Sequence, residues 1–253
     1  MELIFLGTGG GRFVVAKQFR ASGGLLLRKD KNYLLLDPGP GCLIQLARLK
    51  IPLNRIKAVV LSHIHLDHSA DLNVVVDAIT EGGLKKRGYL FLPQTALEEC
   101  IPLPYLRKYV KEIKILKEHT TYSVEGFTFK TSCKLLHGVE NYGFIFYLES
   151  KKTLGILSDT AYFEGLEQEF KEVNYLILNT LRFSPKKELL HLSIEDARKI
   201  LKVVKPELAI LTHFGMTMLR ANPFKIAQEL SKELGIKILA AYDRMKLDLE
   251  NSK

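Results

Sequence analysis

The sequence is poor in cysteine and has no long apolar run. Its three cysteines, Cys42, Cys100 and Cys133, form no C-x-x-C pair, which argues against a disulfide framework and fits a reducing compartment. The apolar start of the chain meets glycines after six residues, which is too short for a signal peptide, and no later run could span a bilayer. We therefore expect a soluble, cytoplasmic protein in which all three cysteines are structural.

The chain also lacks linkers, low-complexity segments and internal repeats. Its 253 residues fit one large α/β domain or two small ones, and an apolar content of 47% is enough for a substantial core. Because no segment reads as a linker, we predict a single domain over residues 1–253.

Acidic residues are in the minority. Lysine and arginine number 37 against 28 acidic residues, which gives a formal net charge of +9. Such an excess favours polyanionic partners such as nucleic acid or phosphate esters. The densest basic segments, residues 85–87 and 107–117, fit a solvated helix face equally well. The sequence therefore leaves both interpretations open.

Metal-ligating side chains, in contrast, are unusually dense in one short segment. His63, His65, Asp67 and His68 fall within six consecutive residues. Residues two apart point to the same side of an extended chain but to opposite sides of a helix, so the spacing predicts a loop in which His63, His65 and Asp67 converge. A polar turn that only capped the next helix would need a single Asp or Ser, and three histidines would be superfluous. The segment therefore predicts a metal site.

Apolar periodicity predicts the elements around this segment. Strands are predicted at residues 3–6, 24–28, 32–37, 57–61, 89–92, 126–133, 142–148, 153–157, 175–179, 208–211 and 236–241. Helices are predicted at residues 43–50, 70–80, 194–204 and from Pro223 to Gly235, with Ser193 and Asn222 as N-caps. The early strands form meanders and the late strands alternate with helices. This order predicts an α/β protein with two mixed sheets and helices outside them.

Three further ligand candidates each follow an apolar strand. These are His137, Asp159 and His213. A lone histidine is more often a surface or core residue than a ligand, but the ends of neighbouring strands gather at one edge of a sheet. Their shared placement therefore favours one common site.

The ordered motifs resemble those of the metallo-β-lactamase fold superfamily. They are Asp37 after an early strand, the run from His63 to His68, and then His137, Asp159 and His213. The resemblance implies a four-layer αββα sandwich of two mixed β-sheets with helices on the outer faces.

Within that superfamily the chain is most similar to the phosphodiesterase branch, which contains ribonuclease Z, the tRNA 3′-end endonuclease, and a cyclic phosphodiesterase of carbon–phosphorus lyase metabolism. The likeness rests on Leu6-Gly7-Thr8-Gly9, on His137 with Gly143-Phe144, and on His191-Leu192-Ser193. Residues 241–245 resemble a Y-D-G-M ending of the cyclic phosphodiesterase-like members, with Arg244 in place of the usual glycine. This departure could alter a turn that faces the substrate.

The resemblance implies two divalent metal ions, with Zn²⁺ as the default and Mn²⁺ or Fe²⁺ as alternatives. Asp37 would accept a hydrogen bond from the second N–H of a ligand histidine, whereas His119 is expected at the surface. One ion would be held by His63, His65 and His137 and the other by Asp67, His68 and His213, with Asp159 bridging both.

A dinuclear centre with ions roughly 3.5 to 4 Å apart can share a bridging hydroxide that attacks a phosphodiester in line. Asp67 would orient the water or accept its proton. His191, similar to the leaving-group histidine of ribonuclease Z, would protonate the departing alkoxide, although it could instead be a helix-start residue. The loop of residues 7–11 fits either a phosphate cradle or an ordinary turn.

The substrate class stays open between a small or cyclic phosphodiester and RNA. The small substrate is favoured, because no long glycine- and proline-rich arm for gripping tRNA lies between His68 and His137. Two other functions remain as alternatives: a thioester or lactone hydrolase on the same fold, and a non-catalytic metal-binding protein. A homodimer is also left open.

Overall fold

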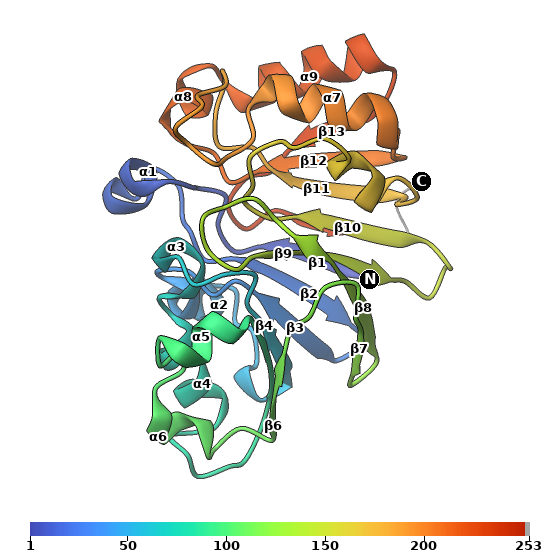
Figure 1. The fold of residues 1–253 in the computed structure, drawn as a ribbon. Coiled ribbons are helices and arrows are strands. Elements are labelled where there is room, and N and C mark those ends of the chain that lie inside the picture. The colour runs from blue at the N-terminus through green and yellow to red at the C-terminus, as the bar shows by residue number, and fades with distance from the viewer. Residues whose placement is uncertain (251–253) are drawn as a thin grey trace.

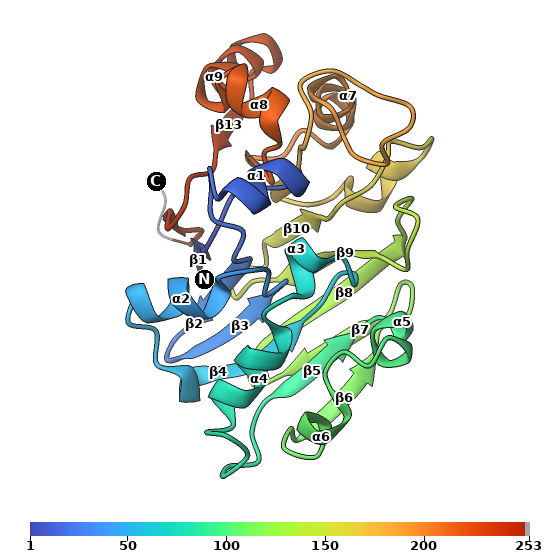
Figure 2. The ribbon, with the colours of Figure 1, turned by 90° about the vertical axis from the view of Figure 1, so that its left-hand side faces the viewer.

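Two mixed, seven-stranded β-sheets form the centre of the molecule, and helices lie on their outer sides (Figures 1 and 2). This description comes from a computed structural model in which residues 1–250 are described. The arrangement confirms the predicted four-layer αββα sandwich. No helix within residues 1–250 is long and apolar enough to cross a membrane.

The first sheet has the strand order β14-β1-β2-β3-β4-β5-β6. Its neighbours pair antiparallel from β14 to β3 and parallel from β3 to β6. Its strands are β1 (Glu2–Phe5), β2 (Leu25–Lys29), β3 (Asn32–Leu36), β4 (Ile56–Val60), β5 (Tyr89–Leu92), β6 (Glu112–Ile115) and β14 (Lys246–Asp248).

The second sheet has the order β13-β12-β11-β10-β9-β8-β7. Pairing is parallel from β13 to β10 and antiparallel from β10 to β7. Its strands are β7 (Thr121–Val124), β8 (Phe127–Lys134), β9 (Tyr142–Tyr147), β10 (Thr153–Leu157), β11 (Tyr175–Asn179), β12 (Leu208–Thr212) and β13 (Lys237–Ala240).

Both faces of the central strands are buried. In β1, Leu3 and Phe5 belong to the core between the sheets, whereas Ile4 packs in the core beneath the helices of the first sheet. In β12, Ile210 faces the space between the sheets and Leu211 faces the helices of the second sheet. Burial on both sides explains why these strands read as continuous apolar runs rather than as alternating ones.

The helices cover the outer faces, with α2 and α4 on the first sheet and α7 and α9 on the second (Figure 1). Ser193 and Asp196 form the capping box that starts α7, and the Asn222 side chain caps α9, as predicted. The helices are α1 (Arg12–Lys17), α2 (Cys42–Arg48), α3 (Leu66–Ser69), α4 (Leu72–Ile79), α5 (Gln94–Glu98), α6 (Pro104–Arg107), α7 (Ile194–Val204), α8 (Met216–Arg220) and α9 (Pro223–Leu234), with 3₁₀ turns η1 (Leu53–Arg55) and η2 (Leu166–Phe170).

The elements that sequence patterns missed lie at sheet edges or are short. The basic segment 107–117 is not one helix face, because it contains β6, an edge strand whose charged residues alternate with half-buried isoleucines. Such alternating, half-exposed edges carry a weak apolar signal. The strands β7 and β14 are edge strands as well, and α1, α5, α6 and α8 have four to six residues each. The cysteines are unpaired, with Cys42 buried and Cys100 exposed.

Candidate metal centre

All seven predicted ligands meet at one place, because the strands that precede them end at the same side of the two sheets. His63 follows β4, His137 follows β8, Asp159 follows β10 and His213 follows β12. Their ligand atoms fall into two groups, within each of which the atoms lie within 4.8 Å of one another. The expectation that residues at the ends of neighbouring strands lie together is therefore confirmed for these residues. Their role as metal ligands stays a prediction.

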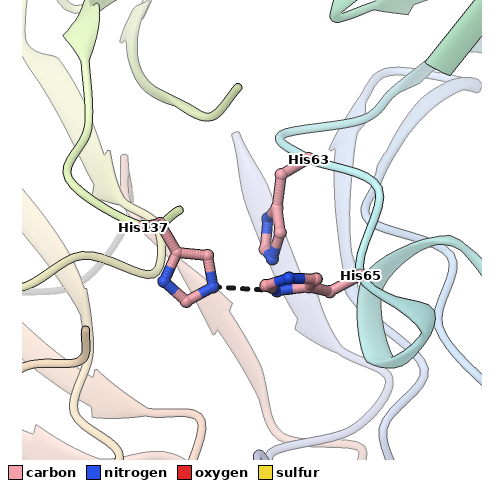
Figure 3. Close-up of side chains that lie close together, drawn as sticks. All are labelled: His63, His65 and His137. Atoms are coloured by element: carbon pink, nitrogen blue, oxygen red, sulfur yellow. Dashed lines mark hydrogen bonds between the residues drawn. The ribbon is translucent and has the colours of Figure 1, made fainter. Parts of the chain in front are cut away.

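The first group, here called the three-histidine cluster, consists of His63, His65 and His137 (Figure 3). His65 Nδ1 lies 3.0 Å from His137 Nε2. His63 is fully buried, and its Nε2 has no hydrogen-bond partner within residues 1–250. Burial and the neighbouring His68 hold the pKa of His63 well below its usual value, and burial with His137 lowers the pKa of His65. The rings of His63 and His65 are therefore neutral near pH 7, which is the state that binds a metal.

Hydrogen bonds fix which nitrogen of His63 carries its proton. Ser62 Oγ donates its single proton to Asp37 Oδ2 at 2.7 Å, because an ionised carboxylate can only accept. The hydroxyl oxygen must then accept from His63 Nδ1 at 2.9 Å. His63 Nε2 is left with a free lone pair that faces the cluster. In the same way, His137 Nδ1 donates to the carbonyl oxygen of Leu190 at 2.8 Å, so Nε2 carries no proton and can accept from His65 Nδ1 at 3.0 Å.

The second group, here called the acidic cluster, consists of Asp67, His68, Asp159 and His213. Asp159 Oδ2 lies 3.2 Å from His68 Nε2 and 3.1 Å from His213 Nε2. The same oxygen is 3.7 Å from His137 Nε2 of the three-histidine cluster. Asp67 Oδ2 completes the group at 3.6 Å from His213 Nε2. Asp159 therefore stands between the two clusters.

Charge in the acidic cluster is shared between carboxylates and imidazoles. Burial raises the pKa of Asp159, but His213, His68 and His191 outweigh it and hold that pKa well below its usual range. Burial also opposes ionisation of Asp67, yet His68 and His213 lower its pKa. Conversely, burial lowers the pKa of His68, but Asp159 and Asp37 together raise it well above normal. The two carboxylates are therefore ionised and ready to bind a cation.

Asp37 supports the acidic cluster from outside. Its Oδ2 lies 3.0 Å from His68 Nδ1, which is the contact expected of an acceptor for the second N–H of this candidate ligand. Its Oδ1 accepts from the backbone N–H of Ser62 at 2.7 Å. Both Asp37 and His213 hold left-handed backbone conformations, with φ of 53° and 60°. Such conformations cost about 1 to 3 kcal/mol each and cluster at functional sites.

The metal-ligating run is only partly an extended loop. His63 and His65 lie in a loop, but α3 begins directly after His65 and carries Asp67 and His68. The backbone N–H groups of His68 and Ser69 donate to His65 O at 2.9 and 3.0 Å and close this turn. Asp67 accordingly belongs to the acidic cluster, whereas His63 and His65 belong to the three-histidine cluster. The start of the helix divides the run between the two clusters.

The donors fit divalent metal ions. His63 Nε2 and His213 Nε2 are buried without a hydrogen-bond partner among residues 1–250, the latter because its approach to Asp159 lacks hydrogen-bonding geometry. Buried polar atoms are rarely left unpaired, so each calls for a ligand. Imidazole nitrogens and carboxylate oxygens form the usual donor set of Zn²⁺, and other first-row ions accept it too.

His191 lies beside the two clusters rather than apart from them. Its Nδ1 is 3.5 Å from Asp159 Oδ2, and its ring stacks on the His213 ring with centroids 6.2 Å apart. Burial, reinforced by His213 and His137, lowers the pKa of His191 to about 4. The ring is therefore neutral near pH 7. His119, in contrast, is exposed, as predicted.

The glycine loop of residues 7–11 is a structural turn. Thr8 N donates to Asp243 Oδ1 at 2.9 Å, Gly9 N donates to Ala21 O at 2.9 Å, and Gly10 N donates to Phe214 O at 3.2 Å. These N–H groups are not available to a phosphate. Glycine is needed at position 10 because a Cβ there would lie 2.3 Å from His213 Cδ2. The loop therefore lets the backbone approach the candidate ligand His213 closely.

Three polar residues of the site were not singled out from the sequence: Ser62, Asn141 and Asn179. Asn179 Nδ2 donates to Asp159 Oδ1 at 2.8 Å, and Asn141 Nδ2 donates to the backbone oxygen of Asp159. Asn179 ends β11, so its strand-end position was an available signal. Neither amide is a typical metal ligand, and the pattern of ligand types could not reveal them.

Comparisons with known proteins agree with this architecture. Residues 32–214, which include all seven predicted ligands, match the Beta-lactamase superfamily domain. An uncharacterized protein of Methanocaldococcus jannaschii is 33% identical over 261 residues, which covers all of this chain and 97% of that protein. A metallo-β-lactamase fold protein of Bacillus subtilis has a TM-score of 0.83 at 20% identity, with 97% of this chain and 98% of that chain covered.

A ribonuclease Z of Sulfolobus acidocaldarius is 26% identical over 147 residues. The match covers 57% of this chain and 47% of that enzyme, so it spans about half of the length of each.

Proposed function

Because the chain belongs to the β-lactamase superfamily, whose fold implies divalent metal ions, we propose that it is a dinuclear metal-dependent phosphodiesterase. The proposed substrate is a small or cyclic phosphodiester or RNA. The likeness to ribonuclease Z over half of the chain supports a phosphodiester, and the net charge of +9 favours an anionic substrate.

One observation carries the proposal. Four imidazole nitrogens, from His68, His213, His191 and His137, surround Asp159 Oδ2 at 3.1 to 3.7 Å. A carboxylate oxygen between two groups of metal-ligating side chains is suited to serve both. This arrangement favours a two-ion centre over a single-ion site, and two-ion centres are common in phosphodiester hydrolysis.

The side chains around the centre have separate roles in this proposal. Two divalent ions, when bound, supply Lewis-acid stabilisation of the phosphoryl transition state and lower the pKa of water. Asp67 stays ionised and reaches the acidic cluster with Oδ2, so it is placed to orient a water molecule by accepting a hydrogen bond. The buried His63 and Asp159 keep bulk water away from that side of the centre.

His191 has a separate role in the proposal, at the leaving group. Its Nδ1 faces Asp159, so Nε2 is the nitrogen left for the substrate. The ring is neutral near pH 7 because its pKa is lowered to about 4. It would therefore take up the proton that the attacking water loses and pass that proton to the departing alkoxide.

A substitution at His191 tests this role. His191→Ala should slow cleavage of an alkyl phosphodiester about 100-fold or more, because an alkoxide needs a proton to leave. Cleavage of bis(p-nitrophenyl) phosphate should change far less, because nitrophenolate leaves without one. The matched control is His119→Ala, at the exposed histidine. Equal losses on both substrates would contradict the leaving-group role.

A groove beside the acidic cluster suits the rest of an anionic substrate. It encloses about 220 Å³ between α1 and α8 and begins at Gly10 and Gly11, of which Gly10 packs against His213. Arg12 and Arg182 line it; neither makes an ion pair within residues 1–250, and Arg182 Nε donates to Ser184 O at 3.1 Å. Phe13, also in the lining, is 75% exposed. Unpaired guanidinium groups bind phosphate well, and exposed aromatic rings stack on bases.

The direct test of the function is turnover with defined metal content. Chain stripped with a chelator and reloaded with Zn²⁺, Mn²⁺ or Fe²⁺ should hold two ions and cleave a phosphodiester in a panel of cyclic nucleotides, short RNA and bis(p-nitrophenyl) phosphate. Turnover of thioesters or lactones alone would support the alternative hydrolase. Two bound ions without turnover of any substrate in the panel would favour the non-catalytic alternative.

A further inference from the structure

Asp159 is held from two sides by asparagine side chains that are not themselves metal-ligand candidates. Asn141 Nδ2 donates to its backbone oxygen and Asn179 Nδ2 donates to its Oδ1 at 2.8 Å. Asn141 is fully buried in the β8–β9 loop that also carries His137. The two amides thus tie Asp159 to both the His137 loop and the end of β11.

The position of Asn179 follows from the sheet. Strands β10 and β11 are parallel neighbours, with Leu157 paired to Leu178. Their C-terminal ends therefore lie side by side, so the residue that ends β11 faces the loop that follows β10. Asn179 itself pairs with Thr212 on β12, directly before His213. It is placed between two segments of the acidic cluster.

The hydrogen bond decides which carboxylate oxygen meets the histidines. An ionised carboxylate has two equivalent oxygens that exchange by rotation. With Oδ1 engaged by Asn179, only Oδ2 faces His68 and His213. A carboxylate can only accept, so the amide must present its NH₂ group and not its oxygen. The donor is neutral and therefore orients Asp159 without cancelling the charge that attracts a cation.

We propose that Asn179 is a positioning residue that fixes Asp159 with one oxygen turned to both clusters. Outer partners of this kind typically change metal affinity about 10- to 100-fold when they are removed. The inference rests on the metal centre of the proposed function, but it is tested by metal binding and not by turnover.

Two substitutions with opposite chemistry separate positioning from simple packing. Asn179→Ala removes the donor, and Asn179→Asp keeps the size but sets a second carboxylate against Asp159 Oδ1. We expect the weaker of two Zn²⁺-binding steps to lose about 10- to 100-fold in affinity in Asn179→Ala and more in Asn179→Asp. A packing role predicts the reverse order, because aspartate fills the same space.

The residue directly before the same strand provides the control. Asn174 directly precedes β11, roughly 16 Å from Asn179 at the rise of an extended strand, and its side chain also makes structural hydrogen bonds. Asn174→Ala should lower the melting temperature without changing Zn²⁺ affinity. Melting of each metal-free variant, followed by circular dichroism, reports its folding separately. If Asn179→Asp does not fold, the Zn²⁺ affinities of Asn179→Ala and Asn174→Ala can still be compared to test the role of Asn179.

The results separate the two proposals. Wild-type-like Zn²⁺ affinity in Asn179→Asp would overturn the positioning role. A wild-type chain that binds two ions but cleaves no phosphodiester would overturn the proposed reaction. The order of the Zn²⁺ affinities of the Asn179 variants would still test the positioning role. A wild-type chain that binds no ion would overturn both.

Discussion

The two halves of the candidate centre are built differently. The three-histidine cluster contains imidazoles and no carboxylate, and two of its members, His63 and His65, come from a single loop and have lowered pKa values. The acidic cluster combines two ionised carboxylates with two imidazoles, drawn from α3 and from the ends of β10 and β12. Carboxylates bind hard cations such as Mn²⁺, whereas imidazoles suit Zn²⁺. The two halves should therefore differ in which ions they accept.

The halves also differ in how firmly the chain holds their side chains. In the acidic cluster, His68 is fixed by Asp37 and Asp159 by Asn179. In the three-histidine cluster, Ser62 fixes His63 and the carbonyl oxygen of Leu190 fixes His137, but the third member, His65, is exposed, and its side-chain hydrogen bond runs only to another candidate ligand, His137. A preorganised site loses less conformational entropy when it binds. The acidic cluster should therefore bind its ion before the three-histidine cluster does.

Removal of the shared residue should give the largest effect. Asp159→Ala deletes the oxygen between the clusters, which is also the carboxylate oxygen nearest to His213 Nε2 and His68 Nε2. We expect at most one bound ion per chain and turnover reduced by about 1,000-fold or more, which corresponds to several kcal/mol of lost transition-state stabilisation. Metal analysis and phosphodiester turnover measure this.

The matched control is His65→Ala, which touches the three-histidine cluster alone. It should keep the ion of the acidic cluster and lose the other. If His65→Ala and Asp159→Ala lost the same number of ions, the two clusters would not be separate sites and the comparison would fail.

A single methyl group should perturb the acidic cluster selectively. In Gly10→Ala the new Cβ would lie 2.3 Å from His213 Cδ2, so the imidazole must move. We expect that one of the two ions binds about 10- to 100-fold more weakly, by calorimetric titration. Gly23→Ala is the control, because its Cβ would meet Cys42 and Leu6 at 3.2 to 3.3 Å and no candidate ligand. An unchanged affinity in Gly10→Ala would mean that His213 is not a ligand.

The place of the candidate centre could be predicted from the sequence. The strands before His63, Asp159 and His213 are buried on both faces and are nearly continuous apolar runs, and a ligand-type residue after each run marks the edge where they meet. Both kinds of information, the apolar pattern of a strand and the type of the residue that follows it, can be read along the chain. For β5, β10, β11 and α7 even the predicted bounds agree with the structure.

What could not be predicted depends on contacts between distant segments. The division of the run at His65 follows from the start of α3, whose four residues are too few for a helical period. The roles of Asn141 and Asn179 arise only when β8, β10 and β11 lie together. Edge strands such as β7, half exposed, carry a pattern too weak to read.

The groove beside the acidic cluster should affect substrate binding and leave both ions in place. Arg12→Ala with Arg182→Ala should raise KM about tenfold for a short RNA, which carries phosphates beyond the scissile bond, because charge-assisted hydrogen bonds contribute about 1.5 to 3 kcal/mol. KM for bis(p-nitrophenyl) phosphate should hardly change. Lys17→Ala removes a basic residue of α1 outside the groove lining and is the control. An equal rise for both substrates would argue against this groove as a substrate site.

The smallest effect should come from the hydroxyl that joins the two halves. Ser62 Oγ accepts from His63 Nδ1 and donates to Asp37, which in turn holds His68. In Ser62→Ala, His63 loses the acceptor that fixes its tautomer, whereas Asp37 still binds His68 and the backbone N–H of residue 62. The three-histidine cluster should therefore weaken by about tenfold and the acidic cluster by less.

Two-step Co²⁺ titration, followed by absorbance, can resolve this difference. Ser69→Ala is the matched control, since Ser69 Oγ donates to Ile64 O in the same segment and contacts neither cluster's ring nitrogens. A larger loss at the acidic cluster in Ser62→Ala would mean that Asp37 depends on the hydroxyl more than His63 does. In that case the acidic cluster would not be the more firmly held half, because its support would pass through a single serine.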